Sequence, residues 1–150
     1  MILPGDRIAV GLSGGKDSPV LLLALAALSG FYPVPFSVCA VTVSPGFPGQ
    51  TAADYEPFVR LCDRLDVEYR VEETRIAQIV FEERKEKAPC SLCAKLRRGA
   101  LCAACQDMGA NRLALGHHRE DAEETLLMSL LYEGRLHTFH PVTYLSKQQI

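Results

Sequence analysis

A glycine-rich hexapeptide, Ser-Gly-Gly-Lys-Asp-Ser at positions 13–18, constrains the fold of this 150-residue chain more than any other stretch. The apolar segment 7–12 before it is typical of a β-strand, and the Leu- and Ala-rich segment 19–28 after it is typical of an α-helix. The two glycines therefore lie at a strand-to-helix turn, where backbone N–H groups and the positive end of the helix favour an anion. The alternative is a glycine turn with a capped helix and no ligand. The turn also carries a cation and two hydroxyl groups, from Lys16, Ser13 and Ser18.

Two common phosphate-binding motifs do not fit this turn. A Walker loop requires a glycine five residues before its Gly-Lys pair, where this chain has Val10, and Ser or Thr after the lysine, where it has Asp17. The dinucleotide-binding Rossmann pattern fails as well, because no glycine stands three residues beyond Gly15. The loop therefore belongs to neither class.

Composition indicates one globular domain over residues 1–150. Hydrophobic residues make up 48% of the chain, enough to bury a single core. The net charge is -2, so nucleic-acid binding would depend on a local basic patch. The chain shows no secretory signal, and the apolar run 20–28 is too short to span a membrane, which favours a cytoplasmic protein without membrane contact. Six cysteines in such a chain predict metal-binding or reactive thiols instead of disulfides.

Strand-like and helix-like segments alternate along the chain. This alternation predicts an α/β fold with a mostly parallel sheet and helices on both faces. The segment 67–72 alternates apolar and charged residues, so we expect it nearer the sheet edge, and we expect Cys39 and Cys62 to be small core residues. The predicted strands are 7–12, 36–43, 67–72 and 112–117, and the predicted helices are 19–28, 54–65, 75–83, 93–108 and 123–132.

Three turns follow the carboxyl ends of predicted strands, at positions 13–18, 44–49 and 116–121. In a parallel sheet these ends meet at the edge where open α/β folds bind ligands. The last turn contains a histidine pair and acidic residues. As an alternative to a catalytic role, these residues have a purely structural role at the start of the next helix. Two strand-to-helix turns on one edge favour a shared ligand.

Two CxxC pairs, at Cys90 and Cys93 and at Cys102 and Cys105, first suggest a four-cysteine zinc site. The segment 93–108 is predicted to be one helix, because it has no strong breaker and a glycine follows its end. Over nine helical residues the rise is about 13.5 Å and the rotation about 180°, which is too far for one zinc ion. We therefore expect the first pair to be the ligand pair. The second pair suits either a core stripe or a local thiol pair.

Four groups of motifs occur in a fixed order: 13–18, 45–48, 90–93 with 96–99, and 115–119 with 124–126. Together they resemble the tRNA 2-thiocytidine synthetase group of the PP-loop ATPase superfamily, the adenine nucleotide α-hydrolase-like proteins, which also contains the tRNA lysidine synthetases. The resemblance covers residues 7 to about 141, and the cysteine pair favours the thiolation branch. It implies a three-layer α/β/α fold with a mostly parallel, Rossmann-like sheet.

The resemblance also implies an enzyme that uses ATP and Mg²⁺ to adenylate a tRNA base and releases pyrophosphate, after which a sulfur nucleophile displaces AMP. Cytidine 2-thiolation is the reaction it favours, with tRNA and a sulfur donor as partners. In this branch a four-iron four-sulfur cluster is held by the CxxC pair and a later cysteine, and zinc is the alternative metal. The residues implied to bind the nucleotide are Ser13, Gly14, Gly15, Lys16, Asp17, Ser18, Val43, Gly116, His117 and Asp121.

Catalytic and metal-binding roles follow from the same resemblance. It implies Lys16 and Asp17 as catalytic residues, with Cys90 and Cys93 as both catalytic residues and metal ligands. Basic residues around the cysteine pair would bind tRNA phosphates, although a solvated surface is the ordinary alternative for the mixed-charge run 82–87. These basic residues are Arg84, Lys85, Lys87, Lys95, Arg97 and Arg98.

The chain departs from the family pattern in three respects. Glu120 stands where relatives usually have aspartate, the second cysteine pair is not part of the pattern, and the sequence stops at Ile150, before the third cluster cysteine and the strand that closes the sheet. We therefore expect a C-terminally truncated domain, or one that pairs with a second copy as a homodimer. Two further functions stay open. One is a lysidine synthetase-like ligase that does not depend on the first cysteine pair, and the other is a non-catalytic cysteine-metal module.

Overall fold

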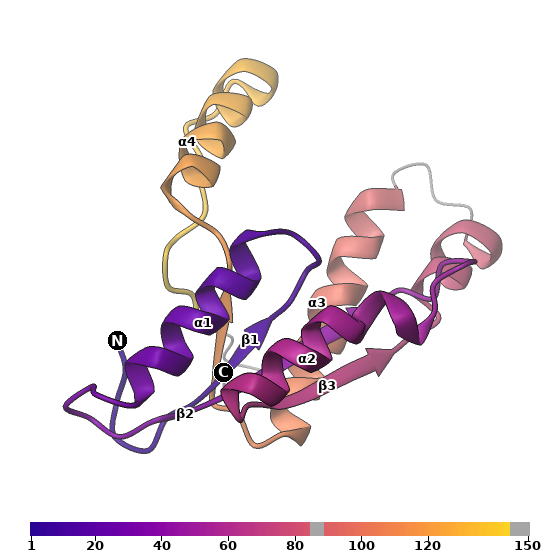
Figure 1. Ribbon diagram of the computed structural model, residues 1–150. Coiled ribbons are helices and arrows are strands. Elements are labelled where there is room, and N and C mark those ends of the chain that lie inside the picture. Colours follow the sequence, from indigo (N-terminus) through magenta and orange to yellow (C-terminus); the bar gives the residue numbers. More distant parts are fainter. Residues whose placement is uncertain (85–88, 145–150) are drawn as a thin grey trace.

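The computed structural model describes residues 1–84 and 89–144. Its sheet has four parallel strands in the order β3-β2-β1-β4 (Figure 1). The predicted parallel α/β sheet is confirmed, and so is the edge position of the third strand. The last strand is shorter than predicted, because the chain turns away from the sheet at Gly116. The strands are β1 (Arg7–Gly11), β2 (Ser37–Ser44), β3 (Glu68–Glu73) and β4 (Arg112–Leu115).

Helices cover both faces of the sheet. Two of them, α1 (Asp17–Ser29) and α2 (Glu56–Leu65), lie on one face, and α3 (Pro89–Asp107) lies on the other (Figure 1). The predicted three-layer α/β/α arrangement is confirmed. A short 3₁₀ turn at Ala52–Tyr55 leads into α2.

Three helix predictions need correction. The predicted helix 75–83 is a short turn that widens into a π-helix, η2 (Gln78–Glu83). The last predicted helix divides into α4 (Arg119–Met128) and a π-helical turn, η3 (Ser129–Glu133), which ends at the left-handed Gly134. The predicted helix 93–108 begins earlier than expected, at Pro89, so the first cysteine pair lies within α3 instead of at the turn before it.

Two apolar clusters hold the three layers together. Val10 and Ala40 point from the sheet toward α1 and α2, where they pack in one cluster with Leu22 and Cys62. Their strand neighbours point to the opposite face, because side chains alternate along a strand. There Ala9, Cys39 and Val41 pack against Ala104 and Cys105 of α3. Cys39 and Cys62 are 0% and 1% exposed, which confirms their predicted place in the core.

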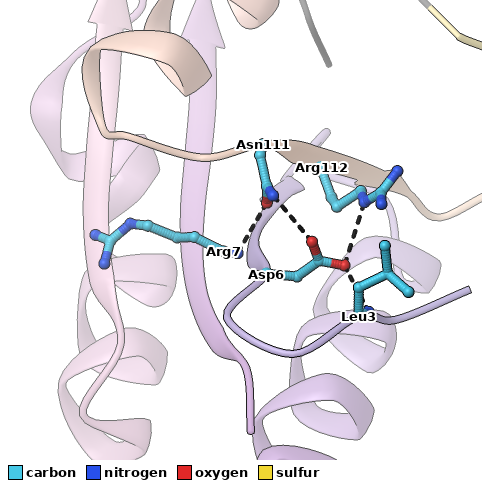
Figure 2. A network of polar contacts seen from close by, with 5 residues as sticks. All are labelled: Leu3, Asp6, Arg7, Asn111 and Arg112. Atoms are coloured by element: carbon cyan, nitrogen blue, oxygen red, sulfur yellow. Dashed lines mark hydrogen bonds and ion pairs between the residues drawn. The ribbon is translucent and has the colours of Figure 1, made fainter. Parts of the chain in front are cut away.

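A buried carboxylate fastens the amino ends of β1 and β4 (Figure 2). The backbone N–H of Leu3 and the Arg112 Nε–H donate to Asp6 Oδ2 at 2.8 and 3.2 Å, and the Asn111 amide donates to Asp6 Oδ1 at 2.9 Å. Asn111 Oδ1 in turn accepts the Arg7 N–H at 2.9 Å. The hydrogen bond from Leu3, together with those from Asn111 and Arg112, lowers the pKa of Asp6 in opposition to its burial. This network fixes β1 to the neighbouring strand β4 at the end of the sheet opposite the glycine loop.

The last helix stands apart from the three layers (Figure 1). Thr138 ties the following segment to it by donating its hydroxyl to the Ala122 carbonyl at 2.9 Å. Among the described residues, no helix combines the length and the apolar character needed to cross a bilayer. Several large apolar side chains on α4 and η3 are exposed, including Leu127, Met128, Leu131 and Tyr132.

Candidate active site

The glycine loop lies directly between β1 and α1, as the sequence predicts. Gly14 has a φ of +89°, which glycine adopts readily, and a Cβ placed there would meet no atom within 4 Å. A Cβ at Gly15 would meet only Ser13 Oγ, at 3.7 Å. The space over both glycines is therefore open, as an approaching phosphate requires.

Ser18 folds the loop back onto the first turn of α1. Its hydroxyl accepts the backbone N–H of Ser13 at 3.1 Å, and the two hydroxyl oxygens lie 3.4 Å apart. Ser18 is 2% exposed, whereas Lys16 is exposed at the tip of the loop. The buried serine shapes the loop, and the exposed lysine is free to reach a ligand in front of it.

The second strand-to-helix turn packs directly against the first. A Cβ at Gly116 would lie 2.8 Å from the Ser18 backbone nitrogen and 3.0 Å from the Asp17 carbonyl carbon. Only glycine permits this approach of two backbones. Since β4 pairs with β1 in parallel, both turns leave the same end of the sheet, whereas a ligand shared by the two turns stays a prediction.

The two histidines of this turn have different surroundings. His118 is the N-cap of α4, and its backbone N–H donates to Asp121 Oδ2 at 2.8 Å. The capping role is therefore present for Asp121, and this hydrogen bond orients its carboxylate. His117 is exposed, with its ring 5.3 Å from that of Phe139.

The loop after β2 is fixed to the end of β3. Thr74 donates its backbone N–H and its hydroxyl to the Ser44 carbonyl, at 3.0 and 2.7 Å. Gly46 has a φ of +76°, and a Cβ there would lie 2.4 Å from the Thr74 carbonyl oxygen, so this position requires glycine. Val43 packs with Ile76 and Val80 and is 7% exposed, so its predicted nucleotide contact stays a prediction.

The two cysteine pairs occupy different environments on α3. Cys90 is exposed and Cys93 is half-buried against the Val43 cluster, whereas Cys102 and Cys105 are fully buried. Burial raises the pKa of Cys105 to about 12 and also raises that of Cys102. The helix is continuous between the pairs, which confirms the geometric argument against one shared zinc ion. The second pair belongs to the core.

The first pair offers two thiol donors one helical turn apart. This spacing fits two ligands of an iron–sulfur cluster or of zinc, both of which prefer thiolates. Within residues 1–84 and 89–144, no group of three or more histidines, cysteines or acidic residues is placed to hold a metal ion. The pair therefore forms a partial ligand set.

The predicted tRNA-binding residues lie on and before α3. Lys95 and Arg98 are three residues apart and share one side of the helix. In the described part of the chain, no ion pair involves Arg84, Lys95, Arg97 or Arg98, all of which are exposed. Lys85 and Lys87 lie outside the described residues.

A parallel sheet with an open glycine loop between its first strand and first helix defines a nucleotide-binding α/β protein. The family model of the PP-loop domain matches residues 3–148, and the chain belongs to this family. The resemblance found in the sequence is thereby confirmed.

The chain is similar to several named proteins. It is 41% identical to the tRNA-cytidine(32) 2-sulfurtransferase of Tolumonas auensis over 94% of this chain and 46% of the relative. It is 38% identical to the protein of the same name from Pelobacter propionicus, over 100% of this chain and 60% of the relative. The chain thus spans about half the length of the curated relatives it matches.

Two solved structures share the fold. The U34-tRNA thiolase NcsA from Methanococcus maripaludis, solved with its [4Fe-4S] cluster, superposes with a TM-score of 0.73 at 26% identity, covering 89% of this chain and 45% of that one. The NH3-dependent NAD synthetase from Campylobacter jejuni superposes with a TM-score of 0.52 at 23% identity, covering 81% and 50%. The second likeness concerns the fold alone.

Sequence reasoning missed two features near or behind the site. Asp6 gave no signal, because a single acidic residue before a strand does not reveal a partner 105 positions away. The sequence places Phe81 in the predicted helix 75–83 and does not reveal that it lies beside Phe47 of the turn 44–49, with ring centroids 5.9 Å apart. Only the folded arrangement brings these residues together.

Proposed function

We propose that the chain is a single ATP-binding domain of an enzyme that adenylates a tRNA base, releases pyrophosphate and serves cytidine 2-thiolation. The observation that carries this proposal is the open glycine loop at the start of α1, with a second turn packed against it. Membership of the PP-loop family supports ATP as the nucleotide, and the names of the relatives support the tRNA base.

In this proposal the loop holds the phosphates of ATP. Its N–H groups, its hydroxyl groups and the Lys16 ammonium face the leaving pyrophosphate, where negative charge develops, and stabilise it electrostatically. Asp17 holds Mg²⁺, which when bound neutralises phosphate charge. The residues assigned to the phosphates and the metal are Ser13, Gly14, Gly15, Lys16, Asp17 and Ser18.

The second turn and the end of β2 form the remaining walls of the nucleotide site. Gly116 and His117 approach the nucleotide, and Asp121, already oriented by the N-cap of α4, serves as a metal or orienting carboxylate. Val43 completes the site through its backbone, since its side chain is covered by apolar neighbours.

Cys90 and Cys93 carry the sulfur chemistry in this proposal. They hold two of the ligand positions of a four-iron four-sulfur cluster, or of zinc as the alternative. The cluster, when bound, supplies the sulfur-transfer chemistry, and a separate donor supplies sulfur. The [4Fe-4S] cluster named for the similar thiolase NcsA supports this assignment.

The tRNA lies along the basic residues near the cysteine pair. Phosphate contacts with exposed Lys and Arg side chains supply most of the affinity of such complexes, which weakens as salt increases. We place the protein in the cytoplasm, because its relatives are named for tRNA modification. The residues assigned to this path are Arg84, Lys85, Lys87, Lys95, Arg97 and Arg98.

We also propose that a second copy of the chain covers the exposed apolar side of α4 and η3. The exposure of Leu131, at 76%, supports a homodimer through this surface. Sedimentation is expected to give a dimer that the Leu131→Asp variant converts to monomer. The matched variant Val20→Asp, on the exposed side of α1, should leave the dimer intact, and a monomeric parent chain would contradict the proposal.

The phosphate site is tested by titrating the chain with α,β-methylene-ATP and Mg²⁺. Gly15→Ala and Asp17→Ala should each weaken binding about 10- to 100-fold, because they remove open space or a magnesium ligand. Gly30→Ala is the matched control at the other end of α1, where a Cβ meets nothing closer than 3.5 Å. Unchanged affinity in the two loop variants would refute the assigned site.

The reaction branch is tested separately, by supplying tRNA and ATP with either lysine or a sulfur donor. A sulfurtransferase requires the sulfur donor and loses activity in Cys93→Ser. A lysidine-type ligase would use lysine and retain full activity in the same variant. A non-catalytic metal module would bind metal without binding ATP at all.

A further inference from the structure

Two phenylalanine rings are exposed near the carboxyl ends of the strands, where the glycine loop also lies. Phe47 is 41% exposed and Phe81 is 50% exposed, although phenylalanine is usually buried. Their ring centroids lie 5.9 Å apart and their planes are inclined by 50°, so each ring contacts the other and also faces solvent. They come from two different segments, the loop after β2 and the π-helical turn η2.

The backbone under each ring is fixed. Gly46 is held against the Thr74 carbonyl, and the next residue, Phe47, donates its N–H to Gln50 Oε1 at 3.1 Å. Val80, which precedes Phe81, is 0% exposed and anchors η2 in an apolar cluster. Wide helical turns of this type are frequent at functional sites. The rings are therefore displayed by fixed backbone segments.

The location of the pair connects it with the proposed chemistry. Val80 shares its cluster with Cys93, so the segment that carries Phe81 packs beside the thiol pair. The loop that carries Phe47 follows the carboxyl end of β2, the strand adjacent to the one that leads into the glycine loop. A planar group that stacks on the rings would thus lie at the same end of the sheet as the glycine loop and the thiol pair of Cys90 and Cys93.

The neighbouring charges favour a nucleobase as the occupant. Glu82 and Glu83 are exposed beside Phe81, and carboxylates accept hydrogen bonds from exocyclic amino groups such as that of cytosine. The exposed bases Lys95, Arg97 and Arg98 on α3 suit the phosphates of the same strand. Unpaired RNA bases characteristically stack on aromatic side chains.

We propose that Phe47 and Phe81 form a stacking platform for an unpaired nucleobase of the RNA substrate. This inference rests on the proposed function, in which the substrate is a tRNA. It adds a specific place where an unpaired base of an RNA hairpin loop is held, at the end of the sheet that carries the glycine loop and the thiol pair.

The test uses an RNA hairpin whose loop carries the fluorescent base 2-aminopurine at each position in turn. Stacking quenches its emission, so the parent chain should quench one loop position strongly. The double variant Phe47→Leu with Phe81→Leu keeps apolar bulk but removes both rings. It should lose the quenching and weaken binding about 5- to 100-fold.

Two further variants separate stacking from folding. Phe47→Tyr with Phe81→Tyr keeps both rings and should restore quenching, and Phe31→Leu removes a ring that is 75% exposed just beyond the end of α1 and should change nothing. Quenching that is unaffected by the double leucine variant, or absent in the parent chain, would overturn the platform. A change of oligomeric state in that variant without a change in quenching would also overturn it.

Titration with α,β-methylene-ATP on the same preparations separates this inference from the proposed function. The double leucine variant should bind the analogue as the parent does. If the parent binds the analogue and the hairpin but the rings make no difference, only the platform fails. If the parent does not bind the analogue, the proposed function fails, while ring-dependent quenching would still establish the platform.

Discussion

The sheet is built in opposite ways at the two ends of its strands. We call the end with the amino termini of β1 and β4 the closed edge, and the end with their carboxyl termini the open edge. At the amino ends of β1 and β4, the Asp6 carboxylate is 3% exposed and accepts hydrogen bonds from three residues. At the carboxyl ends of the same strands, glycines leave open space and Lys16 is exposed. One edge satisfies its polar groups internally, and the other leaves them available for a ligand. The closed edge therefore fastens β1 to β4, the two strands that lead into the open edge.

The largest expected effect comes from breaking the closed edge. Asp6→Ala removes the carboxylate that accepts hydrogen bonds from Leu3, Asn111 and Arg112. Because their N–H groups then lack this acceptor, the variant should lower the free energy of unfolding by about 3 kcal/mol. Urea denaturation measures this change. Glu68→Ala, which removes an exposed carboxylate paired with Arg7, is the matched control and should cost less than about 1 kcal/mol. Equal losses in the two variants would show that the buried network has no special role.

The next effect tests the contact between the two turns of the open edge. Gly116→Ala places a Cβ against the Ser18 backbone, which forces the turns apart and should weaken binding of α,β-methylene-ATP about 100-fold. Thermal unfolding of the variant, measured in parallel, shows how much of the change is due to loss of fold. Binding equal to that of the parent would mean that the turns do not share one ligand.

A smaller effect separates the two cysteine pairs. Cys105→Ser buries a hydroxyl in the apolar cluster and should destabilise the chain by about 1–3 kcal/mol. Cys90 is exposed, so Cys90→Ser should change the free energy of unfolding by less than about 0.5 kcal/mol. In the native chain, iodoacetamide should modify Cys90 rapidly and leave Cys105 unmodified, because burial keeps the Cys105 thiol protonated. Mass spectrometry would contradict this if both residues were modified at similar rates.

The smallest expected effect is the pH dependence of the closed edge. The hydrogen bond from the Leu3 backbone holds the pKa of Asp6 below its ordinary value in the folded chain, so the contribution of Asp6 to stability is fully present above that ordinary value. It is lost as the pH falls through the lower folded pKa, since the unfolded chain binds the proton first. Urea denaturation at neutral pH and at about pH 3 should show a smaller acid loss for Asp6→Asn than for the parent chain. An identical acid loss in both would assign it to other carboxylates.

Local patterns were sufficient to predict most of the fold. Apolar runs predicted β1 and β2, and alternating apolar and charged residues predicted β3 near the sheet edge. The parallel sheet covered on both faces is confirmed. Helical spacing together with the usual burial of free cysteine correctly assigned Cys62 to the core. The same spacing separated the two cysteine pairs along α3. These features depend on residues that are close in sequence, which is why periodicity reveals them.

Long-range contacts were not predictable in this way. The Asp6–Asn111 hydrogen bond joins residues 105 positions apart, and the close approach of Gly116 to Ser18 depends on the pairing of β4 with β1. The glycine at position 116 was assigned to the nucleotide, but its packing role needs the folded backbone. A π-helical turn, η2, also stands in place of a predicted helix, and its Val80 packs with Val43 of β2 in a contact that the local sequence does not reveal.

The difference between the two edges is tested most directly by nuclear magnetic resonance of the amide groups during titration with α,β-methylene-ATP and Mg²⁺. The account predicts large shifts for the backbone N–H groups of Gly14, Gly15 and Gly116, and none for those of Leu3 and Asn111. Shifts at the closed edge, or no shifts in the glycine loop at saturating nucleotide, would contradict the account.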